Sequence, residues 1–283
     1  MIYKPANTFT LAERKTQSQI RLGLQGFPGT GKTWAALTFP NPVVINLDRG
    51  LGAHGSRTDV IEVPFYDIAF CKTLDIQYHP SKLKDVLVKW LETEGRKLGS
   101  EQTLILDGNT GLQNAYHRWY EANKTLFLTK SGTVNEFSEW TVKRTYFGEI
   151  MEILKSLQCN VVYICHEIDL KDKNGITGPS YSGKVRPLLT GSFGDEILSH
   201  FTDWFRCLAA DKPKAEELTP EYLIKWGMDK KEFLQYVIGF PRNTMYYWQT
   251  ESDNFFDGKT STLSNFPRFL PANYKSFARF MSK

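Results

Sequence analysis

The chain has 283 residues, of which 41% are hydrophobic and 23% are charged, and these ordinary values fit one large α/β domain or a core with a small appendage. The net charge of +4 is compatible with a polyanionic partner but is too small to indicate nucleic-acid binding alone. No stretch approaches the roughly 20 apolar residues of a membrane-spanning helix, and the first residues lack the apolar run of a signal peptide. We therefore expect a cytoplasmic protein that does not enter a membrane.

The cysteines are scattered and form no C-x-x-C pair, which argues against a zinc site or a disulfide framework. Two of them lie in strongly apolar segments, so we expect buried, reduced thiols. The four are Cys71, Cys159, Cys165 and Cys207.

Strand-like and helix-like segments alternate along the first half of the chain, which favours a mainly parallel sheet covered by helices on both faces. The strands are short apolar runs rich in β-branched residues. The helices show apolar residues at helical spacing, as in Lys82–Glu92, and Pro40 ends the first of them. We expect strands over 20–25, 43–47, 59–63 and 103–107, and helices over 32–39, over 82–92 and from about 108 to 122.

The second half contains a further amphipathic helix, which ends near 157 and leads into an apolar strand over 160–165. A loop rich in Gly, Pro, Lys and Ser covers 169–184, and a strand follows over 204–209. The tail is dense in aromatic residues, with a strand over 245–249 and a final helix near 274–280. We divide the chain into an N-terminal arm (1–17), a core (18–210), a helical insertion (211–235) and a small C-terminal β/helical extension (236–283).

Gly26–Thr33 reads Gly-Phe-Pro-Gly-Thr-Gly-Lys-Thr and matches the phosphate-binding motif G-x-x-x-x-G-K-[ST] in full. Glycines at this spacing let successive backbone N–H groups surround a β-phosphate, where a Cβ would obstruct the approach. The lysine supplies a positive charge to the β- and γ-phosphates, and the final threonine ligates Mg²⁺. The motif therefore predicts binding of ATP and Mg²⁺. The expected nucleotide-binding residues are Gly26, Gly29, Thr30, Gly31, Lys32, Thr33 and Trp34.

Asp107 ends an apolar strand and is the expected second residue on the magnesium side, together with Thr33. This expectation assumes that the Asp107 strand lies beside the strand that precedes the phosphate-binding loop. Gly108 and Asn109 follow, so the Asp-Glu pair that is typical of AAA+ motors, helicases and packaging ATPases is absent. The general base must then come from another segment.

Four segments occur in the order found in RecA-like ATPases, namely the phosphate-binding loop, Leu106-Asp107, His166-Glu167 and Pro187–Gly191. Over residues 18–210 the chain resembles the RecA-like P-loop NTPase core, and more closely the phage-encoded nucleotide-binding proteins of that lineage, some of which are single-strand annealing recombinases. The resemblance implies a mainly parallel central sheet flanked by helices. It also implies an ATPase that assembles on single-stranded DNA as a homo-oligomer, a ring or a filament, with ATP between neighbouring subunits.

The same resemblance suggests two catalytic residues besides Lys32. Asp48 follows the strand after the first helix, where RecA-like ATPases carry the acidic residue that orients the attacking water. The alternative role for Asp48 is a turn cap before Gly50. His166 follows a core strand, where RecA-like proteins carry a polar sensor of the γ-phosphate, and its alternative role is purely structural.

RecA-like proteins contact DNA through two loops, and the second of these corresponds here to Asp169–Leu188. Basic residues would neutralise phosphates, and a tyrosine would stack on a base. The alternative is a solvated surface loop. The first DNA loop corresponds to Lys124–Thr133. The expected DNA-binding residues of the second loop are Lys171, Lys173, Tyr181, Lys184 and Arg186.

The leading hypothesis is therefore a DNA-stimulated ATPase of phage recombination or replication, located in the host cytoplasm. A nucleotide-gated assembly or regulatory ATPase that does not bind DNA is the alternative, and the modest net charge favours it. A small-molecule or nucleic-acid kinase is a third possibility, but the sequence shows no lid arginine cluster to support it.

Overall fold

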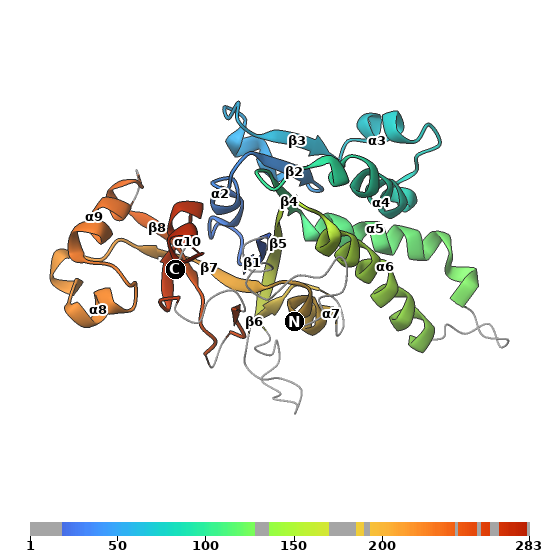
Figure 1. The fold of residues 1–283 in the computed structure, drawn as a ribbon. Helices are drawn as coiled ribbons and strands as arrows, with labels where there is room; N and C mark the ends of the chain where they lie inside the picture. Colours follow the sequence, from blue (N-terminus) through green and yellow to red (C-terminus); the bar gives the residue numbers. More distant parts are fainter. Residues whose placement is uncertain are drawn as a thin grey trace, which may run out of the picture.

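The computed structural model describes residues 19–127, 136–169, 185–189, 193–240, 243–253, 256–260 and 266–281. A central sheet runs through the molecule (Figure 1). In spatial order its strands are β10 (Phe269–Pro271), β8 (Thr244–Gln249), β7 (Asp203–Asp211), β1 (Arg21–Gly26), β5 (Asn160–Asp169), β4 (Thr103–Asp107), β2 (Pro42–Asn46) and β3 (Ile61–Pro64).

The strands from β7 to β3 are all parallel, whereas β8 and β10 are antiparallel to their neighbours. Two short strands lie off this path, β6 (Val185–Pro187) on β5 and β9 (Lys259–Thr260) on β7. The expected α/β class with a mainly parallel sheet is confirmed.

The central strands are continuous apolar runs because helices cover both faces of the sheet. Every residue of β1, β2 and β4 is buried. Side chains alternate between the faces, so Leu104 and Leu106 pack in one hydrophobic cluster and Ile105 in the other. The first cluster lies under α4 (Leu83–Thr93), α5 (Asn109–Ala122) and α6 (Glu136–Ser156), which Figure 1 shows together, and the second under α2 (Lys32–Ala36) and α10 (Tyr274–Met281).

Helix α2 ends at Ala36, three residues before the expected end. The backbone N–H groups of Thr38 and Phe39 bond to carbonyls three residues back, so the chain tightens into turns ahead of Pro40 and Pro42. The remaining α-helices of the described ranges are α3 (Ile68–Leu74), α7 (Phe193–Glu196), α8 (Pro220–Ile224) and α9 (Lys230–Ile238).

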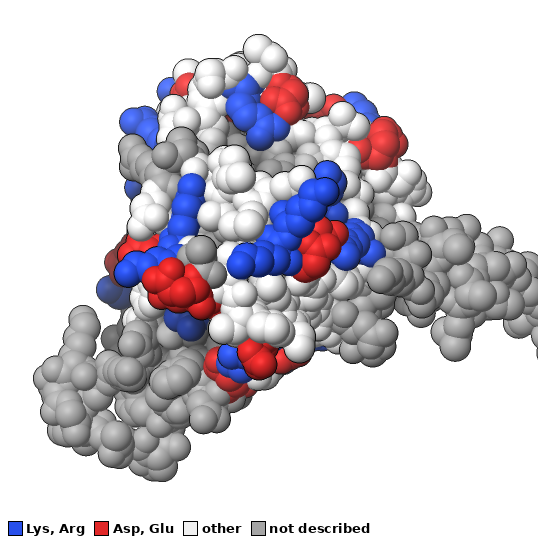
Figure 2. Space-filling view, turned by 90° about the vertical axis from the view of Figure 1, so that its left-hand side faces the viewer, with Lys and Arg blue, Asp and Glu red and all other residues white. Residues whose placement is uncertain are grey.

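Helices α8 and α9 form a small layer at one end of the sheet, with a cluster of their own around Trp226, Phe233 and Met245. A reciprocal capping box between Asp229 and Glu232 begins α9. Figure 2 faces this end of the molecule and shows basic and acidic side chains interspersed among uncharged ones. This visible face therefore carries no broad field of a single sign among the described residues.

All four cysteines are free and buried, as expected. None of the helices in the described ranges has the length and apolarity needed to cross a bilayer.

Candidate active site

A cavity of about 520 Å³ opens where β1, β2 and β4 end, and Ile164, Cys165 and His166 of β5 also line it. The carboxyl ends of parallel strands meet at one edge of a sheet, which is where open α/β folds place their ligands. The lining includes eight of the residues expected from the sequence, which are Gly29, Gly31, Lys32, Thr33, Trp34, Asp48, Asp107 and His166.

The curvature of the phosphate-binding loop depends on its glycines. Gly29 and Gly31 have φ values of 81° and 77°, which L-residues with a Cβ rarely adopt. Gly26 is held by close packing instead, since a Cβ there would lie 2.6 Å from Thr30 Oγ1. Thr30 in turn donates from Oγ1 to the carbonyl of Phe27 at 2.8 Å. Glycine at these positions therefore lets the loop keep this shape without backbone strain or a steric clash.

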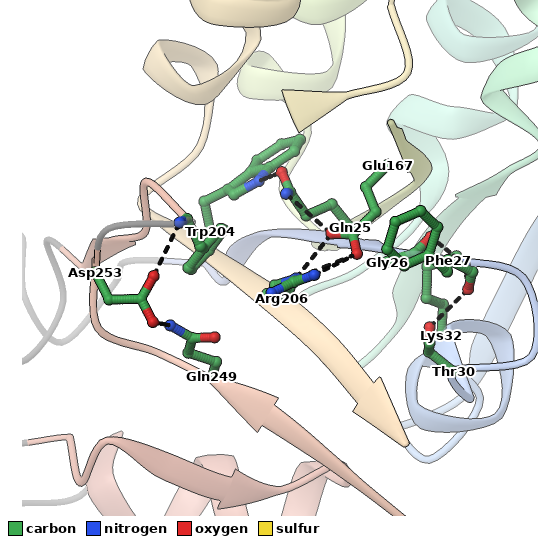
Figure 3. Close-up of polar contacts among 11 residues, drawn as sticks. Gln25, Gly26, Phe27, Thr30, Lys32, Glu167, Trp204, Arg206, Gln249 and Asp253 are labelled. Carbon is green, nitrogen blue, oxygen red and sulfur yellow. Dashed lines mark hydrogen bonds and ion pairs between the residues drawn. The ribbon is translucent and has the colours of Figure 1, made fainter. Parts of the chain in front are cut away.

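Lys32 lies inside the curve of the loop (Figure 3). Its Nζ donates to the carbonyl oxygens of Gly26 and Phe27, each at 2.8 Å. Burial lowers the pKa of Lys32, and the neighbouring Cys207, Cys165 and Asp107 oppose this shift. Within the described residues the ammonium bonds to neutral carbonyls and to no carboxylate, so an incoming anion would place an opposite charge directly against it.

Thr33 and Asp107 meet as the sequence predicted, with Thr33 Oγ1 donating to Asp107 Oδ2 at 2.8 Å. Burial raises the pKa of Asp107 to about 6, although the bond from Thr33 acts in the opposite direction. A hydroxyl and a carboxylate side by side are hard oxygen ligands, which suit Mg²⁺ alongside phosphate oxygens and water. The described residues contain no group of three or more His, Cys, Asp or Glu side chains that would hold a metal alone.

The expectation that the Asp107 strand lies beside the strand that precedes the phosphate-binding loop was wrong. Strand β4 does not lie beside β1, because β5 pairs with both and separates them. The almost wholly apolar residues Asn160–Cys165 of β5 occupy this central position. Thr33 lies at the start of α2, after the loop. Its side chain reaches past β5 to the end of β4, where it forms the hydrogen bond with Asp107.

Asp48 is exposed at the cavity wall and caps the following turn, since its Oδ1 accepts from the Gly50 N–H at 3.2 Å. Asp48 therefore has the alternative role of a turn cap before Gly50. Its negative charge also contributes to raising the pKa of Asp107, which places it close to the expected magnesium side. The cap and a catalytic role are compatible.

Gly108 makes room for Asp48, a relation that the sequence analysis missed. Its φ is 102°, and a Cβ on Gly108 would lie 2.9 Å from Asp48 Cγ. The glycine directly after Asp107 was visible as a departure from the Asp-Glu pair, but its partner 60 positions earlier was not.

His166 lies within β5, which continues to Asp169 instead of ending at residue 165 as expected, and it is level with Gly26, the last residue of β1. Burial lowers the pKa of His166, and the ammonium of Lys32 lowers it further, while Asp48 opposes both. Its Nδ1 is buried and has no hydrogen-bond partner among the described residues. The ring is therefore neutral near pH 7 and retains unused hydrogen-bonding capacity beside the cavity.

Leu188, the residue after β6, forms two hydrogen bonds through its backbone with residues of the site, and the sequence did not predict them. Leu188 donates its N–H to the carbonyl of His166 at 2.6 Å, and its carbonyl accepts from Asn109 Nδ2 at 3.2 Å. Asn109 is buried and lines the cavity. The strand that returns from 170–184 is thus tied to both His166 and α5.

A buried ion pair between Glu167 and Arg206 lies next to the site, since Glu167 directly follows His166 (Figure 3). Arg206 of β7 donates from Nη2 to Glu167 Oε1 at 2.9 Å, and Gln25 of β1 donates from Nε2 to the other carboxylate oxygen at 3.3 Å. Gln25 Oε1 accepts from Trp204 Nε1 at 2.7 Å. This network joins β1, β5 and β7 beneath the loop, and its signal in the sequence was polar residues within apolar strands.

Of the expected DNA-binding residues, the structure describes Arg186 alone, and Arg186 is not among the residues that line the cavity. Lys171, Lys173, Tyr181 and Lys184 lie outside the described residues, and so do 128–133 of the expected first loop. Arg186 lies in β6, opposite Ile168 of β5. Phe127 is buried and stacks on Tyr120 with the ring centroids 5.1 Å apart, so it is a core residue.

Comparison with known proteins gives one family match. A family model described as an AAA domain matches residues 18–208. No curated protein matches the chain. Among solved structures, the crystal structure of the RadB recombinase is similar at 10% sequence identity, with 69% of this chain and 76% of that chain covered and a TM-score of 0.32.

Proposed function

The chain belongs to the AAA domain family, and from that premise we propose that it is a Mg²⁺-dependent ATPase of the RecA-like kind. One observation carries the proposal: a single cavity brings together the glycine loop, the Lys32 ammonium and the Thr33–Asp107 pair. These are the groups that phosphoryl transfer needs to position a triphosphate and neutralise its charge.

In this proposal the loop N–H groups bind the β-phosphate. Lys32 exchanges its two carbonyl acceptors for β- and γ-phosphate oxygens, which gains charge-assisted hydrogen bonds in place of neutral ones. Thr33 would hold Mg²⁺ through its hydroxyl, and Asp107, whose Oδ2 lies 2.8 Å from that hydroxyl, would help to position the metal.

Asp48 is the proposed base that orients the attacking water, and His166 is the proposed sensor of the γ-phosphate. Asp48 is solvent-exposed at the cavity wall, so water reaches it, and its carboxylate has one oxygen beyond the one that caps Gly50. His166 has an unused ring nitrogen and a backbone link to Leu188, and this link gives the site a direct connection to the segment that returns through β6.

We further propose that single-stranded DNA is the partner, bound by the basic residues of 169–188, and that the protein assembles as a homo-oligomer in phage recombination or replication. The resemblance of the sequence to RecA-like proteins supports this part. A nucleotide-gated assembly protein that does not bind DNA is the alternative, favoured by the net charge of +4 and the interspersed charges of Figure 2.

ATP hydrolysis with and without single-stranded DNA tests the proposal in five proteins: wild type, Lys32→Ala, Asp48→Asn, His166→Ala and the control Lys89→Ala. Lys32→Ala should abolish turnover, whereas Lys89→Ala, an exposed lysine on α4, should leave it unchanged. Asp48→Asn keeps an oxygen for the Gly50 cap but loses the charge, so turnover should fall by about 10²-fold or more while nucleotide still binds.

Stimulation by DNA separates the two candidate functions. Binding of single-stranded DNA that weakens steeply with salt, together with faster turnover, supports the DNA-dependent ATPase. Turnover that is the same with and without DNA, together with no binding of single-stranded DNA at low salt, supports the assembly protein. Near-normal turnover in Asp48→Asn would remove Asp48 as the base.

A further inference from the structure

Aromatic side chains form one wall of the cavity, and the proposed chemistry at the phosphates does not use them. Trp34 directly follows Thr33 and lines the cavity, and it remains 36% exposed. Its ring lies 5.5 Å from that of Phe240 and 6.2 Å from that of Tyr246, centroid to centroid, with tilted planes. The indole is thus supported by two further rings and keeps surface open beside the phosphate-binding residues.

Tyr246 also lies against the loop itself. A Cβ added to Gly31 would come within 2.7 Å of Tyr246 Cγ, so the absence of a side chain at Gly31 allows this close approach. Phe240 is buried and meets Tyr246 edge-on at 5.6 Å. The wall is therefore a packed assembly with a defined position relative to the phosphate site.

The segment that completes this wall lies outside the range matched by the family model, which ends at residue 208. Tyr246 belongs to β8 and pairs with Ala209 of β7, and Phe240 follows α9. Part of the nucleotide cavity is thus built by residues C-terminal to the family core.

We propose that Trp34 and Tyr246 form the platform on which the base of the nucleotide stacks, and that this platform selects purine over pyrimidine nucleotides. The inference rests on the proposed function, because it needs a triphosphate anchored on the loop beside Lys32. Flat aromatic faces attract any base, and the larger purine ring system covers more of their area. Base–aromatic stacking strengthens binding by roughly 5- to 150-fold.

Titration calorimetry with Mg²⁺ and ADP, GDP, CDP, UDP or inorganic pyrophosphate tests this platform without hydrolysis. Trp34→Ala should weaken ADP binding by about fivefold or more and leave pyrophosphate binding unchanged, since pyrophosphate has no base. Trp34→Phe should retain most of the ADP affinity. The wild type should bind both purine nucleotides more tightly than both pyrimidine nucleotides, and Trp34→Ala should lose that preference.

Tryptophan fluorescence provides a second measurement that does not depend on Trp34→Ala folding well. ADP should change the emission of the wild type, and this change should disappear in Trp34→Phe although ADP still binds. Equal weakening of ADP and pyrophosphate in Trp34→Ala, or no weakening of either, would overturn the platform and leave the phosphate site standing. If the wild type binds neither ligand, the platform and the proposed function both fail.

Discussion

Replacing Asp107 by asparagine should stabilise the nucleotide-free protein while impairing the proposed Mg²⁺-dependent turnover. The amide keeps an oxygen that can accept from Thr33 Oγ1 and removes a buried charge. With a folded pKa of about 6 against a reference value of 3.8, the easier ionisation of Asp107 in the unfolded state lowers the stability of the folded state by about 3 kcal/mol at about pH 7.5 and by about 1 kcal/mol at about pH 4.5.

The direction in which the stability changes with pH follows from proton uptake by Asp107. Because the folded pKa of Asp107 is raised, the folded state holds more protons than the unfolded state between about pH 4 and about pH 6. The stability that this carboxyl contributes is therefore present at low pH and is lost as the pH rises through about 6. The difference in unfolding free energy between Asp107→Asn and wild type should accordingly grow by about 2 kcal/mol from about pH 4.5 to about pH 7.5.

Urea unfolding at both pH values, in buffer with a chelator and without nucleotide, measures this difference. Titrating groups that are distant from Asp107 are shared by the two proteins and cancel in the comparison. Glu92→Gln, an exposed carboxyl on α4, is the matched control and should show almost no gap at either pH. Two results would contradict a raised pKa of Asp107. One is an Asp107→Asn variant that is less stable than wild type at about pH 7.5, and the other is a difference in unfolding free energy that does not change with pH.

Two glycines of the loop form a matched pair, since Gly31→Ala faces both a φ of 77° and the ring of Tyr246, whereas Gly29→Ala faces a φ of 81° with open space around the new Cβ. We expect Gly29→Ala to lose about 1–2 kcal/mol of stability in urea unfolding and Gly31→Ala to lose clearly more, and equal losses would contradict the close approach. Glu167→Ala should cost about 3–5 kcal/mol in the same assay, because it leaves the Arg206 guanidinium buried without its carboxylate. The double variant Glu167→Met with Arg206→Met should recover most of that loss, and a double variant as unstable as the single one would show that the charge pair is not the cause.

The sequence by itself determined the features that depend on local pattern. The spacing of Gly26–Thr33 predicted the loop, because a phosphate cradle needs glycine, lysine and threonine at set intervals. Continuous apolar runs predicted buried strands such as β2 and β4, since strands covered on both faces have no polar side. Asp107 was found in the same way, as the polar end of such a strand.

Only the tertiary structure decided which of these segments are neighbours. Periodicity reports how much of a segment is buried but not which strand lies beside it, so the position of β5 between β1 and β4 was not predicted. The contact of Gly108 with Asp48 and the wall made by Trp34 with Tyr246 join residues that are distant in sequence. Such contacts depend on how the strands and helices pack together, and a local window of sequence contains no information about that packing.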